Sequence, residues 1–126
     1  MKYVSTDHAP KAIGPYSQAV QIGNALYVSG QIPFDPLTMA VASTEVTGQT
    51  LQSLQNIKAI VEAGRFKITD IVKCTVYLKN MDQFSQMNAV YQEFFGEHRP
   101  ARAAVEVARL PKDVLVEIDA ICVKDN

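Results

Sequence analysis

Hydrophobic and polar residues alternate with a period of two near the start of the chain, and this pattern predicts paired strands. Residues 17–22 and 25–32 read S-Q-A-V-Q-I and A-L-Y-V-S-G-Q-I. Gly23 and Asn24 between them are a short turn signal, so we expect the two segments to form a hairpin. Pro33 directly follows the second segment and is expected to end it.

Two longer segments have the period of a helix. In residues 46–63, apolar side chains recur at spacings of three and four and form one stripe, consisting of Leu51, Leu54, Ile57 and Val61. Gly64 is the expected end of this helix. A second stripe lies further along the chain and consists of Phe84, Met87, Tyr91 and Phe94. Asn80 can cap this second helix, with Gln83 reaching back to it, and Gly96 is expected to end it.

Three more strands are predicted in the second half of the chain. Residues 70–79 alternate cleanly, which is typical of a strand with one face against a core. The predicted core face of this strand consists of Val72, Cys74, Val76 and Leu78. Residues 103–109 and 114–123 are also strand-like, and the sequence L-P-K-D between them suits a tight turn with Pro111 at its second position. We therefore expect the last two strands to form a second hairpin.

The order of these elements indicates an α+β fold, in which a mixed sheet carries two helices on one face. The length of 126 residues fits a single domain spanning residues 1–126. The sheet face without helices combines apolar residues such as Tyr77, Val105 and Ile121 with charged ones. Such a face is covered by water or by a second copy of the chain, and we favour a homo-oligomer whose subunits pack sheet against sheet.

Composition and charge narrow the classes of partner. The net charge is −1, which gives no general attraction to nucleic acid or to an anionic membrane. No apolar run approaches the roughly 18 residues that span a bilayer, and the N-terminus lacks a secretion signal, so a cytoplasmic location is expected. Cys74 and Cys122 are far apart in strand-like segments, which favours two reduced, buried thiols. His8 and His98 have no metal-ligand spacing and are expected in loops or at the surface.

Arg102 and Glu117 are the first candidates for chemistry. A guanidinium matches a carboxylate with two parallel hydrogen bonds, and the small Ala103 and Ala104 beside Arg102 leave room for a ligand. Glu117 can act as a general base if it is shielded and reaches a water molecule. An ion pair of Arg102 and a solvated position for Glu117 are the simpler structural alternatives. In the predicted hairpin Glu117 would lie opposite Glu106, more than about 10 Å from Arg102 along the strands.

Two further segments can contribute to a site. The sequence G-P-Y-S-Q fixes a turn that directs Tyr16, whose hydroxyl can bind a substrate or simply cover a sheet edge. In V-S-G-Q, Gly30 inside a strand indicates close approach of another group, and Ser29 offers a hydroxyl. Neither histidine is placed to activate Ser29, which disfavours a serine hydrolase. The chain has no phosphate-binding loop, dinucleotide fingerprint, zinc signature or EF-hand, so we expect no cofactor and no metal.

Three segments together carry a specific resemblance. They are A-I-G-P-Y-S-Q-A-V near the start, S-G-Q-I-P at 29–33, and P-A-R-A-A-V-E-V-A-R-L-P-K-D-V-L-V-E-I at 100–118. By these segments the chain resembles the RidA (YjgF) family of reactive-intermediate deaminases over essentially its whole length. The resemblance implies a chorismate-mutase-like α+β fold, a homotrimer and ligand sites in the clefts between subunits.

The resemblance also implies an activity, the hydrolysis of 2-imino and enamine acids to 2-oxo acids and ammonia. The usual substrate is 2-aminoacrylate or its tautomer 2-iminopropanoate, released by pyridoxal-phosphate enzymes, and 2-iminobutanoate belongs to the same class. Matching motif to motif assigns Arg102 to the substrate carboxylate and Glu117 to the water, and the residues that would line the cleft are Tyr16, Ser29, Gly30 and Asn88.

The chain departs from the family pattern at three places. Ala104 stands where a cysteine is common, so the backbone N–H remains for a ligand but the thiol is missing. Asp119 stands where a glutamate is usual, and Met39-Ala40 replaces a common Thr-Gly turn. Arg102, which separates the deaminating branch from relatives without this arginine, is retained.

The resulting hypothesis is that Arg102 holds the substrate carboxylate and favours the ionised form of Glu117, which directs water to the imine carbon. Tyr16 or Ser29 would then assist the nitrogen. Two other functions remain open: a sensor that binds a 2-oxo acid such as 2-oxobutanoate without catalysis, and RNA cleavage. The charge of −1 and the lack of interleaved basic and aromatic residues speak against the latter.

Overall fold

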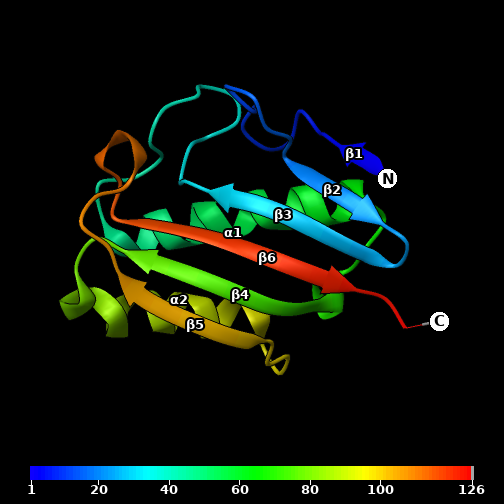
Figure 1. Cartoon of the computed structure of the whole chain (residues 1–126). Helices are drawn as coiled ribbons and strands as arrows, with labels where there is room; N and C mark the ends of the chain where they lie inside the picture. Colours follow the sequence, from blue (N-terminus) through cyan, green and yellow to red (C-terminus); the bar gives the residue numbers. More distant parts are fainter. Residues whose placement is uncertain (126) are drawn as a thin grey trace.

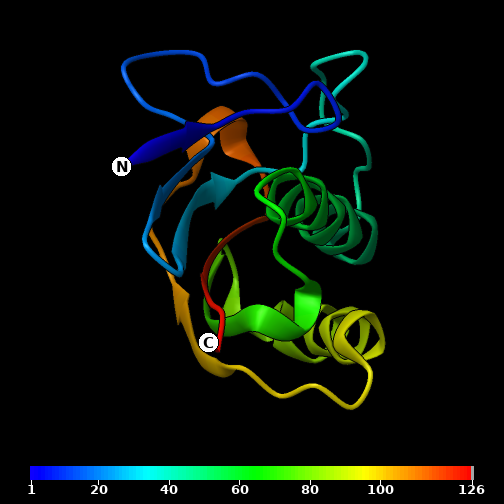
Figure 2. The same ribbon diagram turned by 90° about the vertical axis from the view of Figure 1, so that its right-hand side faces the viewer.

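A computed structural model describes residues 1–125 of the chain. A six-stranded mixed sheet is backed on one face by the two α-helices, as Figures 1 and 2 show. The strands are β1 (Lys2–Val4), β2 (Ala19–Ile22), β3 (Ala25–Gln31), β4 (Ile71–Leu78), β5 (Ala101–Glu106) and β6 (Val116–Val123). The helices are α1 (Val46–Ala63) and α2 (Phe84–Phe95), and three short 3-10 turns lie at Ile68–Asp70, Met81–Gln83 and Pro111–Asp113. The predicted α+β class is confirmed.

The sheet has the strand order β1-β2-β3-β6-β4-β5. All neighbouring strands are antiparallel except β4 and β5, which run parallel with Cys74 opposite Arg102. The chain therefore crosses over through α2 between these two strands, as a parallel pair requires. β5 is an edge strand and β6 lies in the middle of the sheet (Figure 1).

The predicted hairpin of the last two strands is wrong. β6 does not pair with β5 but enters between β3 and β4, so Glu117 lies opposite Tyr77 and not opposite Glu106. Strand β5 ends at Glu106, and Val107 makes the last bond to β4, from its N–H to the Leu78 carbonyl. The residues between Val107 and Val116 then carry the chain from the edge of the sheet to the position of β6. Buried and partly exposed residues alternate along β6, which is typical of an antiparallel strand with one face packed on the core.

The core lies between the sheet and the helices. Helix α1 has the bounds predicted from its period, and Leu54, Ile57 and Val61 are fully buried. Leu51 was placed in the same stripe but is exposed, because the buried face of α1 is completed by Thr50 instead. The Thr50 hydroxyl donates to the Val46 carbonyl at 2.7 Å, and this bond lets a polar side chain be buried there.

Strand β4 departs from the predicted alternation at its start. Val72 is 44% exposed, whereas Ile71 is buried. The register against β6 shifts between Ile71 and Lys73, so one extra residue is accommodated by a β-bulge that turns Val72 away from the core. From Cys74 onward the predicted faces are confirmed.

The beginnings of several elements also differ from the prediction. Strand β1 was not predicted, β2 begins at Ala19, and β5 covers 101–106 where a strand over 103–109 was expected. Asn80 caps the 3-10 turn before α2, accepting from the Asp82 N–H at 2.9 Å, and the expected return bond from Gln83 is not formed. Exposed apolar side chains remain on the helix-free face of the sheet, among them Tyr27 and Val105.

Candidate active site

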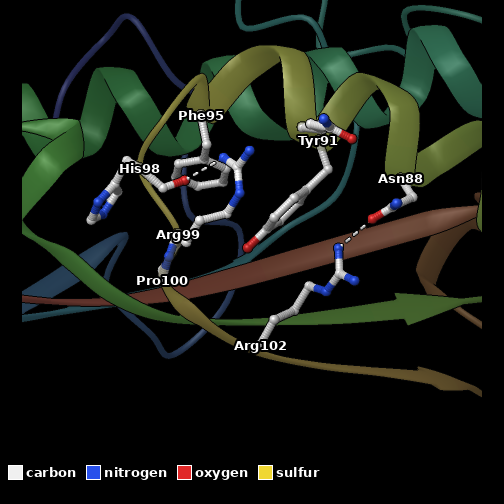
Figure 3. Close-up of a pocket in the computed structure, with 8 residues that line it drawn as sticks. Asn88, Tyr91, Phe95, His98, Arg99, Pro100 and Arg102 are labelled. Atoms are coloured by element: carbon white, nitrogen blue, oxygen red, sulfur yellow. Dashed lines mark hydrogen bonds between the residues drawn. The ribbon is translucent and has the colours of Figure 1, made fainter.

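Arg102 lies near the start of the edge strand β5 and points to the helix side of the sheet. Its Cα partner is Cys74, which is fully buried on that side. One guanidinium nitrogen donates to Asn88 Oδ1 of α2 at 2.6 Å, and the guanidinium carbon lies 4.8 Å from the ring centre of Tyr91 (Figure 3). The Phe84 ring is 5.3 Å away on the same helix. Helix α2 thus holds the charged group through one amide and two aromatic faces.

The space beside Arg102 is a cavity of about 400 Å³ between α2 and the start of β5. It is lined by Asn88, Tyr91, Gln92, Phe95, His98, Arg99, Pro100 and Arg102. Within residues 1–125, Arg102 forms no salt bridge, and the lining contains no carboxylate. The cation is therefore positioned but not neutralised, which suits it to an anionic ligand.

The backbone of Ala104 adds a donor at the open edge of the sheet. The N–H of Val107 bonds the Leu78 carbonyl of β4 at 2.8 Å. Since N–H groups alternate in direction along a strand, those of Arg102, Ala104 and Glu106 point outward from the edge. Ala104 itself is half-buried and packs against the core. The position that lacks the thiol retains a free N–H next to Arg102.

Glu117 lies in a different cavity. This second cavity, of about 540 Å³, includes Tyr16, Gly30, Gln31, Pro111, Lys112 and Glu117 in its lining. On β6, Glu117 alternates with the buried Val116 and Ile118 and so points to the helix-free side of the sheet, opposite Tyr77. Within one chain the sheet therefore separates the Glu117 carboxylate from the Arg102 guanidinium.

The pKa of the Glu117 carboxyl is raised within one chain. Burial raises the pKa of the Glu117 carboxyl above its ordinary value of 4.5, and the negative charge of Asp119 on the same strand raises it further. Asp119 is itself fixed, because its two oxygens accept from the Thr75 N–H at 3.1 Å and from the Tyr77 hydroxyl at 3.2 Å. Within one chain, Arg102 is not among the groups that shift the pKa of this carboxyl, so an effect of Arg102 on Glu117 would require a neighbouring subunit.

Gly30 explains how Glu117 fits against the sheet. The register of β3 against β6 shifts between Val28 and Gln31, which leaves Gly30 in a bulge. A β-carbon built on Gly30 would collide with the carboxyl group of Glu117. The close approach predicted at this glycine is therefore made by a side chain of the same protein.

Tyr16 and Ser29 have different positions. Tyr16 is 53% exposed at the rim of the Glu117 cavity, after a tight turn in which its N–H bonds the Gly14 carbonyl at 2.9 Å. Ser29 lines neither this cavity nor the one beside Arg102. Its hydroxyl donates to the Ser17 carbonyl at 2.6 Å, so in this conformation it ties β3 to the segment before β2.

Sequence reasoning missed two features of these cavities. Tyr91 was assigned only to the apolar stripe of α2, and its ring in fact faces Arg102. Arg99 was not considered, although it stands three residues before Arg102 and directly before Pro100. Among residues 1–125, no group of His, Cys, Asp and Glu side chains has the arrangement of a metal site. The same residues contain no helix that is long and apolar enough to cross a membrane.

The sequence is similar to known proteins over nearly its whole length. The sequence model of a family described as Endoribonuclease L-PSP matches residues 6–124. A RutC family protein of Pyrococcus horikoshii is 56% identical over 122 residues, which cover 97% of each chain. A protein of Salmonella typhimurium named 2-iminobutanoate/2-iminopropanoate deaminase is 55% identical over 126 residues, with 98% of each chain covered.

A solved structure matches the fold closely. The crystal structure of Escherichia coli TdcF with bound serine superimposes with a TM-score of 0.95 at 45% identity, covering 99% of this chain and 100% of that one. The agreement extends over the sheet and both helices, because almost no part of either chain is left out.

Proposed function

Because the chain belongs to the Endoribonuclease L-PSP family, which includes the RidA (YjgF) proteins, we propose that it hydrolyses 2-imino and enamine acids to 2-oxo acids and ammonia. Its substrates would be 2-aminoacrylate, its tautomer 2-iminopropanoate, and 2-iminobutanoate. The observation that carries the proposal is the Arg102 guanidinium, which borders a cavity and has no carboxylate partner within residues 1–125. The name of the Salmonella relative supports the same chemistry.

The proposed site is completed by a second copy of the chain. Arg102 and Glu117 are on opposite faces of one sheet, so a small molecule cannot contact both within one subunit. The free edge of β5 and the exposed apolar side chains of the helix-free face give two surfaces that a partner can cover. We propose a homotrimer in which Arg102 of one subunit and Glu117 of the next share each ligand site.

Each residue has one role in the proposed reaction. Arg102 and the outward N–H of Ala104 bind the substrate carboxylate, and Asn88 holds the guanidinium in place. Glu117, ionised, accepts a proton from the attacking water. Tyr16 at the rim of the same cavity donates to the imine nitrogen, and Ser29 can do so only by leaving the Ser17 carbonyl.

The chemical balance needs no cofactor. The water oxygen forms a bond to the imine carbon, the carbon–nitrogen bond breaks, and both water protons end on the nitrogen, which leaves as ammonia. The carbon becomes the carbonyl of a 2-oxo acid without oxidation or reduction. Positioning of water and substrate, and charge complementarity to the carboxylate, are the contributions required of the protein.

The test generates 2-aminoacrylate with a serine or threonine dehydratase and follows pyruvate, with semicarbazide as a competing trap for the imine. The protein is expected to increase the rate of pyruvate formation. Arg102→Ala should abolish the increase while leaving the oligomer intact, and Arg65→Ala, an exposed arginine after α1, is the matched control. An unchanged rate in Arg102→Ala would remove this residue from the proposed role.

A ligand sensor is the second candidate, favoured by one comparison. The TdcF structure contains serine, a small amino acid. Binding of 2-oxobutanoate to this protein without any effect on imine decay would support the sensor and exclude the deaminase. RNA cleavage has weaker support. The family description names an endoribonuclease, but the chain has a net charge of −1 and lacks the interleaved basic and aromatic residues that bind RNA.

A further inference from the structure

The cavity beside Arg102 contains a second guanidinium, that of Arg99 (Figure 3). Three steps along an extended chain cover at most about 11 Å, so the two side chains start within reach of one small ligand. A regular strand would direct residues three apart to opposite faces. Arg99 precedes β5, however, and its side chain turns back to α2, where Figure 3 shows it beside Phe95.

The Arg99 guanidinium has N–H groups that are not used in hydrogen bonds within the protein. One of its terminal nitrogens donates to the Gly96 carbonyl and, at 3.0 Å, to the His98 carbonyl, just after the end of α2. A guanidinium has five N–H groups, so the Nε and the other terminal nitrogen remain for a ligand. The His98 ring is already engaged, because its Nε2 lies 2.7 Å from the Ile71 carbonyl. The free donors of the cavity include those of the two arginines, the amide nitrogens of Asn88 and Gln92, and the Tyr91 hydroxyl, and only the two arginines among them are charged.

The charge of the cavity exceeds what one carboxylate neutralises. Its lining has two arginines and no aspartate or glutamate. A monocarboxylate bound at Arg102 would leave the Arg99 charge beside it without a counter-ion. A ligand with a second anionic group at its other end satisfies both guanidinium groups, each with charge-assisted hydrogen bonds.

We propose that this protein prefers 2-imino acids with a second carboxylate, in which Arg102 binds the carboxylate next to the imine and Arg99 binds the distal one. This inference rests on the proposed function and specifies its substrate class. The parent compounds are amino acids with an acidic side chain, so the reaction that supplies the substrate is the oxidation of such an amino acid at its α-carbon. The hydrolysis itself is unchanged.

The first measurement is binding, which does not depend on catalysis. The dissociation constants of 2-oxoglutarate and 2-oxobutanoate are determined by calorimetry for the unmodified protein, Arg99→Gln and Arg99→Lys. Arg99→Gln should weaken 2-oxoglutarate binding at least about tenfold, the scale of one hydrogen bond to a charged group, and leave 2-oxobutanoate unchanged. Arg99→Lys, which retains the charge, should recover part of the loss. Arg65→Gln removes one positive charge elsewhere and serves as control.

The second measurement is turnover. Two flavin oxidases, one acting on D-aspartate and one on D-alanine, release 2-iminosuccinate and 2-iminopropanoate with molecular oxygen as oxidant, and a semicarbazide trap reports each imine. Arg99→Gln should lower kcat/KM for 2-iminosuccinate about tenfold and leave that for 2-iminopropanoate unchanged. Melting temperatures of the variants separate this effect from loss of folding.

The outcomes of the two proposals are distinct. The inference would be overturned, and the proposed function left in place, by two results together. The protein accelerates the decay of 2-iminopropanoate, and the unmodified protein and Arg99→Gln bind 2-oxoglutarate equally tightly. Loss of 2-oxoglutarate binding in Arg99→Gln without acceleration of any imine would support the second-carboxylate site and remove the deaminase. Equal weakening of both 2-oxo acids would show that Arg99 only supports the fold around Arg102, and would also overturn the inference.

Discussion

The carboxyl group of Glu117 lies over the backbone of Gly30, in the space that the β-carbon of any other residue would occupy. The two residues lie on neighbouring strands, β3 and β6, and both line the 540 Å³ cavity. Gly30→Ala should therefore displace the carboxyl group. A displacement of about 1 Å in a reacting group can reduce a rate about 100-fold, so we expect a loss of kcat/KM on this scale.

Gly23→Ala is the control for this substitution. Gly23 has a φ of +57° in the turn between β2 and β3, and a β-carbon there meets no atom within 4 Å. Alanine is strained at this φ and should lower the melting temperature without changing the rate. A Gly30→Ala protein with normal kcat/KM would mean that the position of Glu117 is not critical.

A mixing experiment tests whether the site is shared between subunits. Arg102→Ala and Glu117→Gln are each expected to be inactive. If one subunit contributes Arg102 and the next Glu117, unfolding and refolding the two variants together should restore about one site in four by random assembly of a cyclic oligomer. If the mixture remains inactive although mass spectrometry shows that hybrid oligomers have formed, the shared site is contradicted.

Asp119→Asn tests the electrostatic control of Glu117. Asparagine keeps an oxygen for the Thr75 N–H, but it removes the charge that raises the Glu117 pKa. The pKa of Glu117 should fall and still remain above 4.5, because burial is the larger cause. Carboxyl-carbon NMR titration measures this directly. Because the ionised form is the proposed base, the acid limb of the rate profile should move to lower pH.

An unchanged titration of Glu117 in Asp119→Asn would contradict the coupling. The corresponding substitution Asp125→Asn removes a carboxylate near the C-terminus, outside β6, and should leave the Glu117 titration as it is. The comparison separates the local effect of Asp119 from a change in net charge.

The two cysteines should be unreactive in the folded protein. Burial raises the pKa of Cys74 to about 11 and that of Cys122 to about 12, so very little thiolate exists at neutral pH. Alkylation by iodoacetamide at pH 8 should be far slower than in urea, as followed by mass spectrometry. Fast native alkylation would show that the core opens readily around β4 and β6.

The same shifts predict a direction for stability. Folding raises the thiol pKa values, so the contribution of neutral thiols to the free energy of unfolding is complete below the ordinary value of 9.0. It declines as the pH rises through about 11, and Cys74→Ala should reduce this decline in urea denaturation measurements.

The pattern of the chain was enough to predict helix α1, most of β4 and the α+β class. These elements depend on local periodicity, which a single sequence displays. The resemblance named Asn88 together with Arg102, and in the structure Asn88 contacts Arg102 and lines the same cavity. The Val72 bulge was not predicted, because an extra residue in one strand becomes visible only against the partner strand.

The position of β6 shows why pairing is harder to predict than the strands themselves. The turn signal L-P-K-D suggested that β5 and β6 are neighbours. In the structure β5 pairs with β4 instead, and the two strands are parallel because the chain between them crosses over through α2. The local turn signal contains no information about this crossover. The second guanidinium of the cavity escaped notice for a similar reason: Arg99 is brought to α2 by its position before β5 and not by any alternating pattern.

The edge strand β5 has a consequence for the separated chain. Its outward N–H groups have no partner strand on that side within residues 1–125. An uncovered edge of this kind is a template onto which another polypeptide can add a strand. If the proposed homotrimer forms, its dissociation on dilution would create the species most prone to aggregate, and the contact proposed to complete each ligand site would also preserve solubility.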